Sequence, residues 1–171
     1  MILKTANFNT PIGEMVAISD SKKLYLLDFS DRKKLDHKIK KLCTNINASL
    51  TYGITDPISS IKSELESYFN GTIKKFKTHF HLLGTTFQNH VWQELINIPY
   101  GKTRSYISQA QSINKPKAVR AVANANGANN LAILIPCHRI INNNGKLGGD
   151  GGGLTRKKWL IEHEQKFNPI Y

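Results

Sequence analysis

The first half of the chain mixes strand-like and helix-like spacing of its apolar residues. Residues 14–29 contain two short apolar runs on either side of a polar turn, which predicts two short strands. Apolar positions recur at helical spacing in residues 35–42 and again in residues 57–69, which predicts two helices. Residues 72–83 are expected to be extended. This pattern predicts a small mixed α/β domain over residues 1–83.

From Gly84 onward the apolar spacing becomes mainly helical. Thr85 and Gln88 have the spacing of a capping box and predict a helix whose apolar face follows them. That face is formed by Phe87, Val91, Trp92, Leu95 and Ile96. Two shorter helical patterns, at residues 105–111 and 116–124, are separated by a tight turn. Two short helices joined by a tight turn on a basic chain indicate a helix-turn-helix, a DNA-binding motif.

Arg120 is expected to point outward from the second of these helices. At about 100° per residue it lies roughly opposite Ala118 and Val122, which face the interior. An outward arginine is usually just solvated, but on a recognition helix it is a candidate for DNA contact.

The last part of the chain carries one more apolar run and one more helix. Residues 131–135 (LAILI) have the composition of a short buried strand, and a helix is expected around Leu160. The predicted fold class is therefore α/β in the α+β sense. The small mixed domain is followed, over residues 84–171, by a mainly helical domain that contains the helix-turn-helix and a short active-site strand.

The charge of the chain favours a polyanionic partner. It has 24 Lys and Arg against 12 Asp and Glu, a formal net charge of +12. Basic residues outnumber acidic ones 13 to 8 in residues 1–83 and 11 to 4 in residues 84–171, so the excess is present in both halves. An excess of this kind is compatible with DNA binding but also occurs in proteins that are simply basic.

No apolar run approaches the roughly 18 residues that a membrane span needs, and the N-terminus has no apolar signal core. We therefore expect a cytoplasmic protein that does not associate with membranes. The two cysteines, Cys43 and Cys137, are far apart in dissimilar contexts, so a disulfide is not expected. No Cys or His pair has the spacing of zinc ligands, and no metal is expected.

Cys137 stands in a context that suggests reactivity rather than simple burial. A free cysteine after an apolar run is most often a buried core residue. Here Pro136 interrupts the run just before the thiol, and His138 and Arg139 follow it. An imidazole and a guanidinium favour the thiolate over the thiol. His138 can serve Cys137 only if the chain turns at this point or a water lies between them.

Glu164 is the carboxylate expected to orient His138. On the last helix Glu164 falls about 40° from the buried direction through Leu160, whereas Glu162 falls about 160° away. A buried carboxylate needs a partner, and either His138 or a backbone donor would supply it.

The glycine-rich run at residues 148–153 has two interpretations. It lacks the Gly-Lys-Ser/Thr ending of a phosphate-binding loop. It is either a flexible connector or a backbone-lined wall that a flat base can approach closely.

Over residues 84–166 the sequence resembles the methylated-DNA–protein-cysteine methyltransferases, also called O6-alkylguanine-DNA alkyltransferases. The most specific part of the resemblance is the run Ile135-Pro136-Cys137-His138-Arg139-Ile140. The other matching stretches are 84–88 with 91–92, 98–101, 105–106, 116–122, 125–129, 151–154, 157–160 and 163–164. Residues 1–83 match only in size and rough pattern.

The resemblance implies a role for each matching residue. Cys137 is the alkyl acceptor, His138 draws its proton through a water, and Glu164 orients the imidazole. Asn129 holds the turn that presents Cys137, and Tyr106 donates a proton towards N3 of the purine.

The resemblance also implies how DNA is bound. Arg120 enters the base stack in place of the extruded nucleotide, and the other DNA contacts expected of this helix are Lys117, Ala121, Ala123 and Asn124. The pocket for the flipped base is expected to be formed by Tyr106, Ile140, Asp150 and Gly151. Asp150 departs from the family, which usually has an aromatic residue there, and this leaves the affinity for bulky alkyl groups open.

The function predicted is therefore direct reversal of DNA damage. The protein binds duplex DNA as a monomer, flips out O6-alkylguanine and transfers the alkyl group irreversibly to Cys137, without a cofactor. O4-alkylthymine is a second candidate lesion. One alternative is a helix-turn-helix DNA-binding protein without catalysis, which gives Cys137 no role. Another is a thiol enzyme that acts on a small molecule, which leaves the basic helix pair unexplained.

Overall fold

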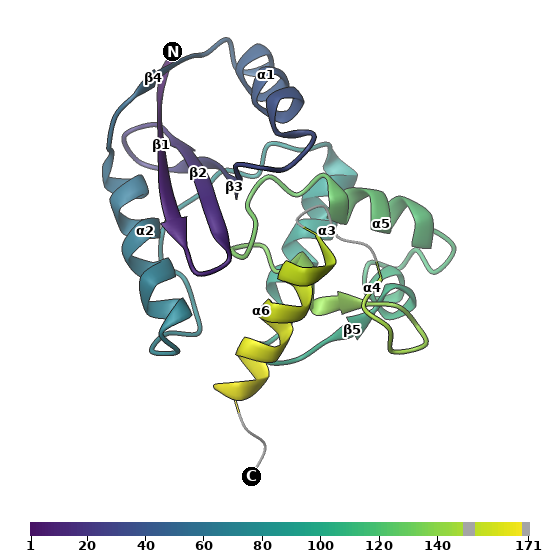
Figure 1. Ribbon diagram of the computed structural model, residues 1–171. Helices are drawn as coiled ribbons and strands as arrows, with labels where there is room; N and C mark the ends of the chain where they lie inside the picture. Colours follow the sequence, from purple (N-terminus) through teal and green to yellow (C-terminus); the bar gives the residue numbers. More distant parts are fainter. Residues whose placement is uncertain (149–152, 169–171) are drawn as a thin grey trace. The chain divides into compact units, whose positions relative to one another are not determined.

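The computed structural model describes residues 1–148 and 153–168 (Figure 1). The chain divides into two compact units, Met1–Leu83 and Gly84–Tyr171, which we call the N-terminal unit and the C-terminal unit. Within the described ranges no helix is both long enough and apolar enough to cross a membrane.

The N-terminal unit is a four-stranded sheet with two helices. Its strands lie in the order β3-β2-β1-β4; β1 is antiparallel to β2 and parallel to β4, and β2 is antiparallel to β3. The elements are β1 (Ile2–Thr10), β2 (Gly13–Ser19), β3 (Leu24–Phe29), α1 (Leu35–Asn45), β4 (Ser49–Tyr52) and α2 (Asp56–Phe69).

Alternation along β2 assigns its side chains to two faces of the sheet. Val16 and Ile18 belong to an apolar cluster that includes Leu35 and Leu42 of α1. Ser19, of the opposite parity, hydrogen-bonds to Thr55, the N-cap residue of α2. All of β3 is buried, whereas three of the four residues of β4, at the opposite edge of the sheet, are exposed.

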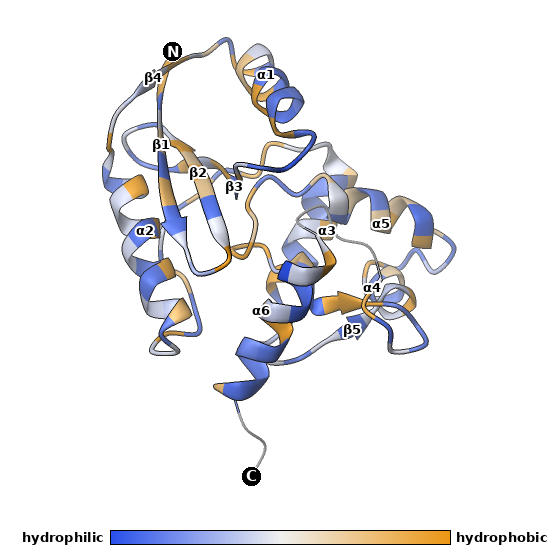
Figure 2. Ribbon diagram, viewed as in Figure 1, coloured by the Kyte–Doolittle hydropathy of each residue, from blue (hydrophilic) through white to orange (hydrophobic). Residues whose placement is uncertain are grey.

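The C-terminal unit is mainly helical. Its elements are α3 (Thr86–Ile96), β5 (Arg104–Ser105), α4 (Tyr106–Ser112), α5 (Val119–Gly127), the 3₁₀ turn η1 (Cys137–Arg139), β6 (Ile140–Ile141) and α6 (Leu154–Lys166). The two short strands β5 and β6 pair in parallel. Helices α4 and α5 form the helix-turn-helix, and both contact α3. Figure 2 shows blue and orange alternating along α5, as expected of an amphipathic helix with one buried face.

Several sequence predictions are confirmed. The mixed α/β class, the β2–β3 hairpin and helices α1 and α2 are present. The capping box is also formed: the Thr85 hydroxyl accepts from the N–H of Gln88 at 3.1 Å, and the Gln88 side chain accepts from the N–H of Thr85 at 3.0 Å.

The predicted strand at residues 131–135 is wrong. The segment is a tight turn in which Ile135 N–H donates to the Leu131 carbonyl at 2.9 Å, and Ile133 has a positive φ of 71°. A short buried apolar run has the same composition whether it pairs in a sheet or folds back on itself. The short strand near Cys137 is instead β6, which begins after the 3₁₀ turn.

Smaller differences occur at element ends. Residues 72–83, expected to be extended, pair with the sheet only through the isolated bridge between Phe80 and Leu24. Helix α5 begins at Val119, so Pro116 lies in the preceding turn, and Gly127 is its last residue. Ile96, expected on the buried face of α3, is 40% exposed and is the last residue of that helix.

Candidate active site

Cys137 is the first residue of a 3₁₀ turn, which turns the chain directly at the thiol. The turn follows Pro136, whose φ of −82° and ψ of 65° end the preceding segment. The condition for His138 to serve Cys137, a turn of the backbone between them, is therefore met. The Cys137 side chain is partly exposed, whereas His138 is buried.

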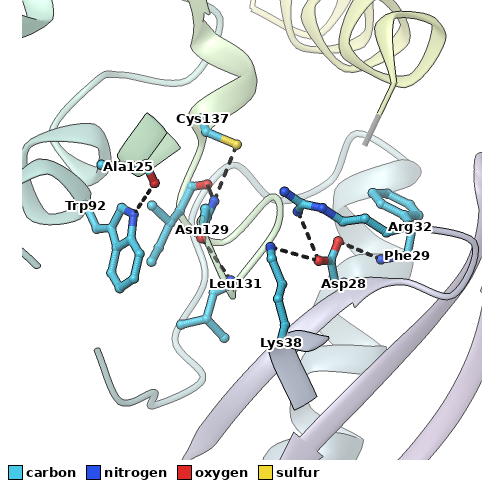
Figure 3. A network of polar contacts seen from close by, with 10 residues as sticks. Asp28, Phe29, Arg32, Lys38, Trp92, Ala125, Asn129, Leu131 and Cys137 are labelled. Atoms are coloured by element: carbon cyan, nitrogen blue, oxygen red, sulfur yellow. Dashed lines mark hydrogen bonds and ion pairs between the residues drawn. The ribbon is translucent and has the colours of Figure 1, made fainter. Parts of the chain in front are cut away.

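Asn129 organises the segment that leads to Cys137 (Figure 3). Its side-chain oxygen accepts from the N–H of Leu131 at 2.8 Å, and its side-chain nitrogen donates to the Ile135 carbonyl at 2.8 Å. The same nitrogen lies 3.4 Å from the Cys137 sulfur. A donor to sulfur favours the thiolate, so Asn129 both closes the turn and contacts the Cys137 sulfur. The first role was predicted; the second was not.

Glu164 is buried, as the helical spacing predicted, and His138, one of the two partners left open by the sequence, is bonded to it. One oxygen of Glu164 lies 2.7 Å from Nε2 of His138. Glu162 on the same helix is exposed, with 64% of its side-chain surface accessible. Because a carboxylate accepts, Nε2 is assigned as the donor, and Nδ1 of His138 then remains available to accept a proton.

Arg139 is a second partner of Glu164, which sequence reasoning missed. Its Nε donates to Glu164 at 2.8 Å, a second guanidinium nitrogen donates at 3.1 Å, and a third donates to the Ile98 carbonyl at 2.6 Å. The guanidinium fork therefore fixes the carboxylate in one orientation. A buried arginine needs such a partner. The burial of Arg139 would have pointed to this contact, but it cannot be read from the sequence.

These contacts keep Glu164 ionised despite its burial. Burial by itself raises the pKa of Glu164. The charge that His138 carries when it is protonated and its hydrogen bond, together with the hydrogen bonds and charge of Arg139, hold that pKa well below its usual range. Glu164 is therefore a permanent anion beside His138 near neutral pH.

A cavity of about 680 Å³ lies between α5, the second helix of the helix-turn-helix and its recognition helix, and the segment that contains Cys137. Its size falls within the roughly 300–1,000 Å³ of small-ligand sites, enough for a purine base. The predicted site residues that line it are Tyr106, Arg120, Ala123, Asn124 and Cys137. Asn142 and Asn143, which no sequence argument singled out, also line it.

The remaining predicted site residues lie in other places. Lys117 and Ala121 are exposed on or just before α5 and do not line the cavity. Ile140 is fully buried, and its N–H donates to the carbonyl of Cys137. Asp150 and Gly151 lie outside the described residues.

Lys157 of α6 is a buried cation beside Tyr106. It is 1% exposed, and its ammonium lies 5.8 Å from the centre of the Tyr106 ring. Lys157 precedes Leu160 by three residues and Glu164 by seven, so helical spacing places all three on one face. That spacing was a signal from which the burial of Lys157 could have been predicted.

Together, the fold and site define a class: a helix-turn-helix protein in which a partly exposed cysteine shares a cavity with the recognition helix. Comparison with known proteins is consistent with that class. The family described as "6-O-methylguanine DNA methyltransferase, DNA binding domain" matches residues 86–166.

The sequence relatives extend the match beyond that domain. A methylated-DNA–protein-cysteine methyltransferase of Mycobacterium bovis is 46% identical over 71% of this chain and 74% of its own length. One of Methanosarcina acetivorans is 38% identical over 93% of this chain and 96% of its own. The crystal structure of Mycobacterium tuberculosis OGT in complex with DNA has a TM-score of 0.82 and 35% identity, covering 99% of this chain and 96% of that one. The chain belongs to the methylated-DNA–protein-cysteine methyltransferase family.

Proposed function

We propose that this protein repairs alkylated DNA by moving the alkyl group from O6 of a guanine onto the sulfur of Cys137. The observation that carries the proposal is the shared cavity: Cys137, Tyr106 and the outward Arg120 of α5 all line it. A thiol that faces the recognition helix of a DNA-binding motif has a reaction partner in the DNA itself. The C-terminal unit would carry both DNA binding and alkyl acceptance.

The reaction is a displacement at carbon. The Cys137 thiolate attacks the alkyl carbon, a carbon–sulfur bond forms, and the bond from carbon to O6 breaks with its electron pair passing to the guanine. The thiol proton passes to Nδ1 of His138 through a water, because Nε2 is engaged by the anionic Glu164. Tyr106 donates towards N3 of the departing guanine as negative charge develops there.

The target carbon lies inside the duplex, so the nucleotide must be extruded before reaction. Arg120 is exposed and lines the cavity, which supports a role in filling the space left in the base stack. Lys117, Ala121, Ala123 and Asn124 are the further DNA contacts that we propose for this helix. Ile140, Asp150 and Gly151 remain the residues proposed to complete the base pocket.

The product is a thioether, which neither His138 nor any other group that the structure describes at this site can hydrolyse, so one molecule repairs one lesion. We propose that O4-alkylthymine is a second substrate, that the protein acts as a monomer, and that it works in the cytoplasm. The two free cysteines support the last point, because thiols that must stay reduced are typical of proteins in a reducing compartment.

The test is incubation with a duplex that contains one O6-methylguanine, followed by intact mass and peptide mapping. We expect a single methyl adduct on Cys137, none with Cys137→Ser, and unchanged transfer with the control Cys43→Ser. Binding of the duplex without any adduct would instead favour the non-catalytic DNA-binding protein.

A further inference from the structure

The recognition helix α5 is held mainly through small side chains. Its buried apolar residues are Val122 and Ala125. Apolar packing has no preferred direction, and small side chains interdigitate little, so such a face tolerates sliding and rotation. Other contacts must therefore fix the register of α5, that is, its rotation and its position along its own axis.

Directional hydrogen bonds are present at the C-terminal end of α5. The Gln109 amide on α4 donates to the Asn126 side-chain oxygen at 2.7 Å, and the Asn126 amide donates back to Gln109 at 2.8 Å. Both side chains are buried, with 3% and 7% of their surface exposed. On the neighbouring residue, the Ala125 carbonyl accepts from the Trp92 indole of α3 at 2.9 Å (Figure 3).

We propose that the reciprocal Gln109–Asn126 pair is a positioning device that sets the register of α5 and thereby the place of Arg120 at the cavity. The inference rests on the proposed function. Asn126 follows Arg120 by six residues on one helix, about 9 Å along its axis, so a shift at one end reaches the other. Both residues line the same cavity.

The chemistry of the pair favours positioning over stability. Replacing both members of a buried hydrogen-bonded pair by apolar groups of the same shape is often nearly neutral for stability. In some proteins one buried polar contact selects a single register among several that apolar packing would accept. Geometry near a reacting centre is far more demanding, since a displacement of about 1 Å can slow a reaction about a hundredfold.

The experiment is a mutant cycle on alkyl transfer from duplex DNA. The double variant Q109M/N126L removes both amides at similar volume, and Gln111→Met, at an exposed glutamine of α4, is its matched control. Each is made with Arg120 present and with Arg120→Ala, and thermal unfolding is measured for all. We expect Q109M/N126L to react about tenfold more slowly when Arg120 is present and less than twofold more slowly when it is absent, because only the first background has an Arg120 to misplace.

Equal slowing in both backgrounds, or no slowing in either, would overturn the inference. If the double variant does not fold, the single Gln109→Met takes the same test, since Asn126 borders the cavity and can bond to water there. Failure of the proposed function gives a different result: the unmodified protein itself would take no alkyl group from the duplex, and the inference would fall with it.

Discussion

The two units of the chain differ in what they bury. Of the eleven polar or charged side chains buried among the described residues, the N-terminal unit has three and the C-terminal unit eight. The eight are Gln109, Asn126, Asn129, His138, Arg139, Lys157, His163 and Glu164. Burying a polar group costs free energy unless its hydrogen bonds are made. The C-terminal unit, which has eight of these groups, also holds Cys137, the alkyl acceptor that we propose.

One buried carboxylate from each unit makes the difference concrete. In the N-terminal unit, Asp28 accepts from the N–H of Phe29 at 2.8 Å and pairs with Arg32 at 3.0 Å and Lys38 at 3.3 Å (Figure 3). Glu164 pairs with Arg139 but also with His138. Lysine and arginine keep their protons near neutral pH, whereas histidine exchanges one there. Asp28 is thus a structural anion, and Glu164 is coupled to a group that can move a proton.

Of the variants that test this difference between the two carboxylates, Glu164→Gln should have the largest effect on alkyl transfer. The amide keeps the size of the side chain but removes the negative charge that orients His138 and stabilises its protonated form. We expect the alkyl-transfer rate to fall about a hundredfold, the usual scale for losing acid–base assistance. Single-turnover rates measure it, with the exposed Glu162→Gln on the same helix as the control. A rate within twofold of the unmodified protein would remove Glu164 from the proposed mechanism.

Arg120→Ala should have a smaller effect that depends on the DNA. In a duplex the extruded base leaves a stack that must be filled, whereas a single strand has less stacking to break. We expect repair in duplex DNA to be about tenfold slower, which corresponds to roughly 1.4 kcal/mol of activation free energy. The loss of rate in single strands should be smaller. Lys117→Ala, an exposed residue just before the same helix, is the control and should weaken binding with both substrates. Equal slowing on both DNAs would make Arg120 an ordinary phosphate contact.

Asp28→Asn tests the other side of the comparison. It keeps the shape of the side chain but leaves Arg32 and Lys38 without their anion. We expect the free energy of unfolding of the N-terminal unit to fall by about 1–3 kcal/mol. The loss is smaller than for a fully buried ion pair because the side chains of Arg32 and Lys38 are about one-tenth exposed. Chemical denaturation measures this loss. At a temperature where the variant is folded, alkyl transfer should fall less than with Glu164→Gln; a larger fall would contradict the division of roles.

The smallest effect is an acid sensitivity due to Glu164. Its pKa is lower in the folded protein than its usual value of 4.5. A group with a depressed folded pKa contributes stability that is present above the unfolded value and is lost as pH falls towards the folded one. Below about pH 5 the stability advantage of the unmodified protein over Glu164→Gln should therefore shrink steadily as the pH falls. Urea denaturation at several pH values measures it, and a pH-independent difference would contradict the sign.

Much of the site could be predicted from local sequence. The setting of Cys137 between Pro136 and His138, the capping box at Thr85 and the inward side of Glu164 depend on neighbours within one or two helical turns. Such patterns are set by backbone geometry and by periodicity, which act over short distances along the chain. For the same reason the outward direction of Arg120 could be predicted before any contact was known.

Other features were decided only by the tertiary structure. The turn at residues 131–135 exists because Asn129 satisfies backbone groups that a strand would pair with a neighbour, and composition alone does not distinguish these cases. The fork from Arg139 to Glu164 spans 25 residues, and the reciprocal amides of Gln109 and Asn126 span 17. The sequence determined which groups were available and which faces they occupied. Which of them meet depends on how helices pack, because the cost of burying a polar group is settled by its partner in space and not by its neighbours in the chain.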